Sequence, residues 1–285
     1  MTAKSKSNSI KTTLAFDIFN HLALGLIALA FLFPFFWMVS NALRSNTEVF
    51  AVPVRIIPNV IEWGNFAEAW TRLPFGRFFL NSVLFSVSVT LITLVVSVLA
   101  GYAFARLRFR GREQLLLLYV STLMIPGMML VIPLFLIISK MGLVNTFAGL
   151  ILPVSFGTFG VFMLRQFFLG IPKELEEAAL VDGASRLRIV ISLIVPLSMP
   201  AIALLSLFTF VGQWNNFLWP LIIMNGPETA TLPLGLTLFQ TQQGTAWNYI
   251  MAGATFSMVP GVVLAIALQK LIYSSISMSS GMGGR

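Results

Sequence analysis

The sequence predicts an all-α membrane protein with six transmembrane helices, and three observations support this fold class. Of its 285 residues, 57% are hydrophobic and only 10% are charged, whereas an ordinary soluble domain has about 25% charged residues. Several uncharged stretches exceed the ~20 apolar residues that cross a bilayer. Because hydrocarbon offers backbone amides no hydrogen-bond partner, these stretches must be helical, and the short alternating segments of a transmembrane barrel are absent.

Charged residues mark the ends of the predicted spans. Four uncharged stretches, each closed by Lys or Arg, give the first four helices, and two longer stretches after Arg188 and Glu228 give the last two. The predicted spans are residues 18–40, 78–103, 114–138, 146–168, 201–223 and 248–270, within a single domain of residues 1–285. Pro126, Gly127 and Pro133 interrupt the third span, as in helices whose backbone lines a cavity.

Basic residues predict the orientation. If the N-terminus is cytoplasmic, thirteen of the eighteen Lys and Arg residues fall in inside segments. The positive-inside rule therefore predicts cytoplasmic termini and a cytoplasmic loop at 169–199. The cluster RLRFRGRE, residues 106–113, is interpreted as an inside anchor. The net charge of +8 is then mainly a topology signal, and no nucleic-acid partner is predicted.

The predicted spans lack the groups that would power transport. They contain no clear Asp, Glu, Lys or Arg, and the single histidine, His21, lies at the mouth of the first span. Ion-coupled carriers usually hold such a residue in the membrane. A nucleotide-binding loop G-x-x-x-x-G-K-[ST] needs a Gly-Lys pair, and none of the 21 glycines precedes lysine. We predict no catalytic residue and no metal ligand, so energy for uphill transport must come from a partner.

One polar run, KELEEAALVDGASRLRIV, interrupts the apolar second half of the chain. Pro172 suits the first turn of a helix, and three glutamates, Glu174, Glu176 and Glu177, place negative charge near its positive end. Four residues spaced by three and four share one face: Leu175, Ala178, Ala179 and Asp182. The two alanines on that face would let another backbone approach closely.

The same run contains a signal for a turn and a second helix. Gly183 can adopt the left-handed conformation that ends a helix, and Ser185 can cap the next one. The sequence therefore predicts a short helix, a turn and a second helix, held between the fourth and fifth spans. Docked into a groove of a soluble protein, this element would convert the partner's movement into tilting of the spans.

The segment EAALVDGASRLRIVISLIVPL resembles the cytoplasmic EAA signature of ATP-binding-cassette (ABC) importer permeases. Glu177, Ala178 and Ala179 are followed by Gly183 four residues later and by Pro196 thirteen residues after that. Leu193 and Val195 stand where isoleucine and leucine are usual. The resemblance covers nearly the whole chain, including MIPGMMLVIPLF and QWNNFLWPLI, and is to the carbohydrate-importer branch with maltose-type subunits. The chain ends in GMGGR where family members often end in a GAVKG-like tail.

The resemblance implies a type I importer permease fold in a bacterial or archaeal cytoplasmic (inner) membrane. It implies a complex with a second homologous permease as a heterodimer, two ATPase subunits and an extracytoplasmic solute-binding protein. This chain would be a non-catalytic subunit in the lipid bilayer that binds no cofactor, since ATP and Mg would be bound by the ATPase. The cargo implied is a mono- or oligosaccharide.

In this family the EAA loop is the coupling helix, seated in a cleft of the ATPase, and Glu177 would form a salt bridge there. The residues expected to couple to the ATPase are Glu174, Glu177, Ala178, Ala179, Asp182, Gly183, Ala184 and Arg186. The alternative is an amphipathic helix resting on lipid, which would need large apolar residues on one face. That face offers mainly Leu175 and Ala178.

Candidates for the substrate path are neutral polar and aromatic groups, because sugar hydroxyls need hydrogen-bond partners and sugar faces rest on rings. They are Gln213, Trp214, Asn215 and Asn216 in the fifth span and Ser155 and Thr158 in the fourth. Alternatively, the tryptophan is an interfacial residue and the asparagines join helices. The outside loop 225–248 is expected either to dock the binding protein or to re-enter the membrane.

Other functions remain open at this point. The same type of subunit could import glycerol 3-phosphate or a glycerophosphodiester, with the phosphate recognised by basic residues of a partner. A self-contained secondary carrier or channel would move its cargo without an ATPase. A structural membrane subunit would have no transport path at all.

Overall fold

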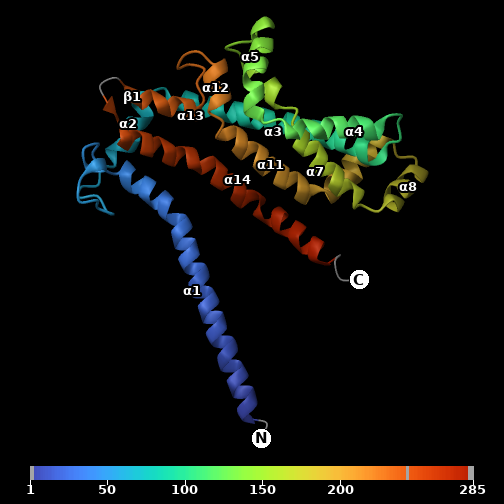
Figure 1. The fold of residues 1–285 in the computed structure, drawn as a ribbon, viewed down its shortest axis with the longest axis horizontal. Helices are drawn as coiled ribbons and strands as arrows, with labels where there is room; N and C mark the ends of the chain where they lie inside the picture. Colours follow the sequence, from blue (N-terminus) through green and yellow to red (C-terminus); the bar gives the residue numbers. More distant parts are fainter. Residues whose placement is uncertain (1–2, 242–243, 282–285) are drawn as a thin grey trace. The chain divides into compact units, whose positions relative to one another are not determined.

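The computed structural model describes residues 3–241 and 244–281 and is mostly helical (Figure 1). The contacts of the chain form two compact units. The first unit contains the chain up to Trp70 together with Phe239–Phe256, and the second contains Thr71–Leu238 and the chain from Ser257 onward.

The first unit begins with the long helix α1, Ala3–Ala42. It also contains η1 (Glu48–Phe50), most of α2 (Gly64–Arg72), the paired strands β1 (Gln240–Thr241) and β2 (Gly244–Thr245), and the start of α14 (Trp247–Gly281). The two strands are antiparallel, with Gln240 opposite Thr245. The apolar side chains of α1 between Phe16 and Phe36 are exposed in the isolated chain, as expected for a helix that faces lipid or another subunit.

Buried hydrogen bonds hold the segment that follows α1. Arg44 is 1% exposed, donates to Ser40 Oγ at 3.1 Å, and lies 5.0 Å from the ring centre of Trp37. Asn65 Nδ2 donates to the carbonyls of Ala42 and Arg44 at 2.9 and 2.7 Å. The bond to Ala42 satisfies a carbonyl that the end of α1 leaves without a helical partner, and the bond to Arg44 holds the chain just beyond the helix.

The second unit is built around α3 (Phe75–Arg106), which packs against α7 (Thr158–Leu169) and α11 (Met199–Trp214) (Figure 1). Two glycines permit the close approach of α3 to α7. A Cβ atom on Gly101 would lie 3.2 Å from the backbone nitrogen of Arg165, and one on Gly160 would lie 2.4 Å from Ser97 Oγ. Side chains at these positions would force the two helices apart.

The remaining elements of this unit are short. They are α4 (Arg112–Ser121), η2 (Thr122–Met124), η3 (Gly127–Leu130), α5 (Val131–Lys140), α6 (Phe147–Ile151), η4 (Leu152–Val154), α8 (Lys173–Val181), α9 (Arg186–Ile189), the π-helix η5 (Val190–Ile194), α10 (Val195–Leu197), α12 (Leu218–Ile223) and α13 (Leu232–Leu236). The 3₁₀-helix η6, Thr237–Phe239, ends where the first unit resumes.

Between three and six segments of the described chain could cross a membrane. Three single helices are long and apolar enough: Phe16–Ala42, Phe75–Arg106 and Trp247–Ile272. Three more pass when two bent halves are joined: Arg112–Met124 with Gly127–Lys140 at 95°, Phe147–Val154 with Thr158–Leu169 at 43°, and Arg186–Leu197 with Met199–Trp214 at 81°. The expected interruption at Pro126 and Gly127 is confirmed, whereas Pro133 lies in the first turn of α5 and does not break it.

The helix expected over 201–223 is not continuous in the structure. α11 ends at Trp214 and α12 starts at Leu218. Asn215 Nδ2 bonds to the carbonyl of Val211 at 3.0 Å, and Asn216 Oδ1 accepts from the backbone N–H of Trp219 at 3.3 Å. Short polar side chains that bond to nearby backbone groups compete with the helix and favour a break.

Candidate functional site

The polar run forms the expected helix, turn and second helix. α8 begins at Lys173 directly after Pro172 and ends at Val181. Gly183 has φ +80°, so its predicted left-handed conformation is confirmed. The backbone N–H of Ala184 donates to the carbonyl of Ala179 at 2.9 Å and so satisfies a carbonyl in the last turn of α8. Ser185 Oγ accepts from the backbone N–H of Arg188 at 3.3 Å, which confirms the predicted cap of α9.

α8 presents one face to the protein core and another to solvent. Ala179 and Leu180 pack against a buried cluster that includes Leu164, Phe168 and Ile189. The opposite face is exposed and contains Leu175, Ala178, Val181 and Asp182, with Glu174 and Glu177 beside it. Of the residues expected to share one face, Ala179 therefore points inward and the other three are available to a partner.

Glu176 is the buried residue of α8. Its Oε1 lies 2.7 Å from Nε of Arg106, and both side chains are almost fully buried, at 5% and 3% exposure. The hydroxyl of Tyr102 donates to the other carboxylate oxygen at 3.1 Å. Arg106 also donates through Nη2 to the carbonyl of Phe168 at 2.7 Å and to that of Ile171. The ion pair ties α8 to the end of α3 and to the segment between α7 and α8.

The interpretation of residues 106–113 as an anchor for the inside surface was wrong for Arg106. This side chain is buried in a specific ion pair because the end of α3 lies under α8. From the sequence, Glu176 was predicted only to place negative charge near the start of the helix, together with Glu174 and Glu177. Its spacing of three and four residues from Ala179 and Leu180 puts these residues on one face, but only the contact with Arg106 shows that this face points inward.

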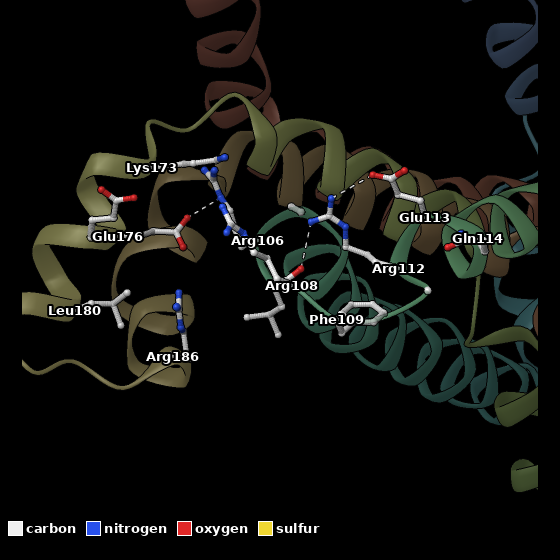
Figure 2. Close-up of a pocket in the computed structure, with 14 residues that line it drawn as sticks. Arg106, Arg108, Phe109, Arg112, Glu113, Gln114, Lys173, Glu176, Leu180 and Arg186 are labelled. Carbon is white, nitrogen blue, oxygen red and sulfur yellow. Dashed lines mark hydrogen bonds and ion pairs between the residues drawn. The ribbon is translucent and has the colours of Figure 1, made fainter.

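An open pocket of about 1070 Å³ lies beside α8 (Figure 2). Its wall combines the segment between α3 and α4 with α8 and the start of α9. Basic side chains line it, namely Arg106, Arg108, Arg112, Lys173 and Arg186, together with the acidic Glu113, Glu176 and Glu177. A helix that rests on lipid needs a broad apolar face, whereas the exposed side of α8 offers only Leu175 and Val181 as large apolar side chains.

The candidates for the substrate path are not brought together. Trp214 is 2% exposed, donates through Nε1 to the carbonyl of Ser257 at 2.8 Å, and stacks on Phe210. Ser155 is fully buried and donates to the carbonyl of Ile151 at 2.7 Å. Both side chains have internal partners: Trp214 joins α11 to α14, whereas Ser155 bonds within its own segment.

The other candidates are more accessible. Thr158 exchanges a hydrogen bond of 2.8 Å with Thr122, and Asn215 is exposed. Asn216 Nδ2 donates to Gln213 Oε1 at 3.0 Å. Gln213 also lines a cavity of about 210 Å³ with Thr93 and Thr209, neither of which was singled out from the sequence.

Comparison with known proteins agrees with this architecture. The family model "Binding-protein-dependent transport system inner membrane component" matches residues 94–278. The sn-glycerol-3-phosphate transport system permease protein UgpE of Pectobacterium atrosepticum is 34% identical over 262 residues, which cover 89% of this chain and 93% of that protein. The arabinooligosaccharides transport system permease protein AraQ of Halalkalibacterium halodurans is 33% identical over 267 residues, covering 92% and 96%.

A solved structure shares the fold. A bacterial ABC transporter involved in the import of the acidic polysaccharide alginate contains a chain that matches with a TM-score of 0.79 and 24% identity. The match covers 91% of this chain and 97% of the other. This likeness assigns the type I importer permease fold. Together with the family model and the two relatives, it shows that the chain belongs to the binding-protein-dependent transport system inner membrane components, the permeases of ABC importers.

Proposed function

We propose that this chain is the transmembrane permease subunit of an ATP-driven, binding-protein-dependent importer for a carbohydrate, and that α8 is its coupling helix. The observation that carries the proposal is the exposed face of α8, which contains Ala178 and Asp182 and has Glu177 beside it. The buried side of the same helix is fixed to the protein by Glu176. A helix that is fixed to its own chain on one side and exposed to solvent on the other can fit into a groove of an ATPase.

Glu177 is the residue proposed to form the salt bridge with the ATPase. It lies on the wall of the charged pocket, next to the inward-facing Glu176, and is itself exposed. Glu174, Ala178, Asp182 and Arg186 are also exposed and would complete the contact. Gly183 would set the turn, and Ala179 and Ala184, which pack against the core, would hold the helix in place.

The proposed assembly is a heterodimer of this chain with a second homologous permease, two ATPase subunits and an extracytoplasmic solute-binding protein. ATP and Mg would be bound by the ATPase, and this chain would be a non-catalytic, multi-pass subunit of a bacterial or archaeal inner membrane with both termini cytoplasmic. ATP binding would draw the coupling helices together and open the cavity towards the binding protein. Hydrolysis would reset it.

A carbohydrate is the cargo that the site supports best. The cavity beside Gln213 is lined by the polar residues Thr93 and Thr209 and by the aromatic residues Phe159 and Phe208. Hydroxyl and amide groups can bond to sugar hydroxyls, and rings can support the apolar faces of a sugar. None of the described residues that line this cavity is ionisable. The relative named for arabinooligosaccharide transport supports the same class.

Glycerol 3-phosphate or a glycerophosphodiester is the second candidate cargo, favoured by the relative named for sn-glycerol-3-phosphate transport. The phosphate would then be recognised by basic residues of the second permease or of the binding protein.

Uptake by the purified assembly tests the proposal. The chain should co-purify with an ATPase, and proteoliposomes holding the whole complex should take up a sugar only with ATP and the loaded binding protein. Glu177→Lys should abolish uptake, because it places a positive charge opposite a basic residue. Flux through this chain alone would instead indicate a self-contained carrier or channel. Uptake of glycerol 3-phosphate without uptake of any sugar would select the second cargo.

A further inference from the structure

The helix α3 is held by buried hydrogen bonds near both of its ends. At one end, Arg106 forms the ion pair with Glu176 of α8 and bonds to the carbonyls of Phe168 and Ile171. These contacts hold α8, the helix proposed to meet the ATPase. Separating the two charges would leave both of them buried without a partner, which is strongly unfavourable. α8 and this end of α3 therefore move together.

The other end of α3 holds a different segment. Asn81 Nδ2 donates to the carbonyls of Glu228 and Ala230 at 3.0 and 2.9 Å. Ser82 Oγ accepts from the backbone N–H of Leu232 at 2.7 Å, at the start of α13. Asn81 and Ser82 are 8% and 1% exposed, so water does not compete for these bonds. The segment 228–232 belongs to the loop 225–248, which the sequence predicts either to dock the binding protein or to re-enter the membrane.

Between these ends α3 is one unbroken helix. Because an α-helix rises about 1.5 Å per residue, Ser82 and Arg106 lie roughly 36 Å apart along the axis of α3. The bent segments of the same unit are broken by 95°, 43° and 81°. A break absorbs a displacement at the hinge, whereas an unbroken helix carries the displacement to its far end. Thr93 Oγ1 also donates to the carbonyl of Ser155 at 3.0 Å, which fixes the middle of α3 to the segment before α7.

We infer that α3 transmits the movement of α8 to the segment 228–232, through the buried Arg106–Glu176 pair at one end and the Asn81 and Ser82 hydrogen bonds at the other. The inference rests on the proposed function, in which α8 meets the ATPase, and takes the first of the two expectations for loop 225–248, that it docks the binding protein. Asn81, Ser82, Arg106 and Glu176 are positioning residues in this account. They act through the elements that they join and contact neither nucleotide nor cargo.

The chain contains no cysteine, so a single introduced cysteine gives one labelling position in it. Glu228 suits a spin label because its side chain is 77% exposed and lies 3.6 Å from the similarly exposed side chain of Arg77. The label is placed by Glu228→Cys in the whole complex, assembled in nanodiscs with cysteine-free partner subunits. Its spectrum is recorded with and without ATP and Mg, in the absence of the binding protein.

Two double variants separate transmission from general damage to α3. Asn81→Ala with Ser82→Ala removes the bonds to the segment 228–232. Ser86→Ala with Thr90→Val is the matched control, because these two residues are equally buried on α3 but donate only to carbonyls of their own helix. Single Ser82→Ala and Ser86→Ala chains provide the same comparison if the double variant assembles poorly.

The inference predicts that ATP changes the spectrum of the label in the wild-type background and in the control, but not in Asn81→Ala with Ser82→Ala. Stimulation of ATP hydrolysis by the loaded binding protein should fall about 5-fold or more in that variant, at the lower end of typical coupling between sites. Hydrolysis without the binding protein should stay within about twofold, because the ATPase end is untouched.

Two results would overturn the inference and leave the proposed function intact. One is an unresponsive label in a wild-type complex that hydrolyses ATP and imports cargo. The other is a response retained in Asn81→Ala with Ser82→Ala, since the segment would then move by another route. A complex without an ATPase, or without ATP-driven uptake, would overturn the proposed function and this inference with it.

Discussion

Arg106 Nε lies 2.7 Å from Oε1 of Glu176, and this buried ion pair joins the last residue of α3 to the helix α8, 70 positions later in the sequence. The pair holds α8 by its inward side and leaves the opposite side bare. In the proposed function, this geometry would let α8 receive force from an ATPase without detaching from its own chain.

The ion pair should respond asymmetrically to substitution. Glu176→Ala leaves Arg106 buried without its charge partner, and we expect a loss of about 3–5 kcal/mol of stability. Arg106→Met combined with Glu176→Met removes both charges and should be the milder change. The thermal unfolding midpoint of the purified complex provides the measurement. Lys140→Ala, an exposed charge at the end of α5 and outside the proposed ATPase contact, is the control and should leave the midpoint unchanged. Equal destabilisation by the single and double variants would argue against the pair.

Gly183→Ala tests the turn after α8. Nothing lies within 4 Å of a Cβ atom added there, so the cost comes only from the backbone angle φ of +80°. We expect a loss of roughly 1–2 kcal/mol, and a smaller loss for Gly183→Asn, because asparagine tolerates this conformation better. Unfolding midpoints of the two variants give the comparison. An alanine variant as stable as the asparagine variant would show that the turn changes shape.

Gly160→Ala tests the close crossing of α3 and α7. The added Cβ would lie 2.4 Å from Ser97 Oγ, 3.1 Å from Leu205 Cδ2 and 3.2 Å from Ser97 Cβ. Overpacking of this kind costs about 1–3 kcal/mol, and adding Ser97→Gly should restore the part that Ser97 causes. Gly261→Ala is the control, since its Cβ would meet nothing within 4 Å. Unfolding midpoints of the single and double variants decide the point, and failure of the second substitution to rescue the first would contradict this packing.

Gln213 and Trp214 are neighbours in sequence but should differ in function. Gln213→Ala removes an amide from the cavity wall and should raise the apparent KM of uptake. Trp214→Phe removes the donor to the carbonyl of Ser257 and should cost roughly 1–3 kcal/mol of stability with little change in KM. Uptake kinetics and unfolding midpoints of both variants separate the two roles. A raised KM in Trp214→Phe alone would place the cargo elsewhere.

Local rules were sufficient for the polar run. Pro172, Gly183 and Ser185 act through their own backbone geometry and nearby hydrogen bonds. Their positions in the sequence therefore define where α8 begins, where it ends and where α9 begins. The inward side of α8 could not be predicted in the same way. It depends on Arg106 lying under Glu176, a contact between residues that are distant in sequence.

The region 201–223 shows a different limit. Its hydropathy is continuous, so a single span was expected, yet Asn215 and Asn216 bond to the backbone and end the helix. Residues 186–214 instead form a segment bent by 81° that starts directly after the α8 turn. Hydropathy measures the length of an apolar stretch, but the direction of the chain within it depends on side-chain hydrogen bonds and packing.

The central claim is that the bare side of α8 binds an ATPase. A photoreactive side chain at Val181, which is 88% exposed on that side, tests it directly in the membrane-embedded complex. Irradiation should yield an adduct between this chain and the ATPase subunit, whereas the same group at Leu117 on α4, 72% exposed, should not. An adduct with lipid alone at residue 181 would contradict the account.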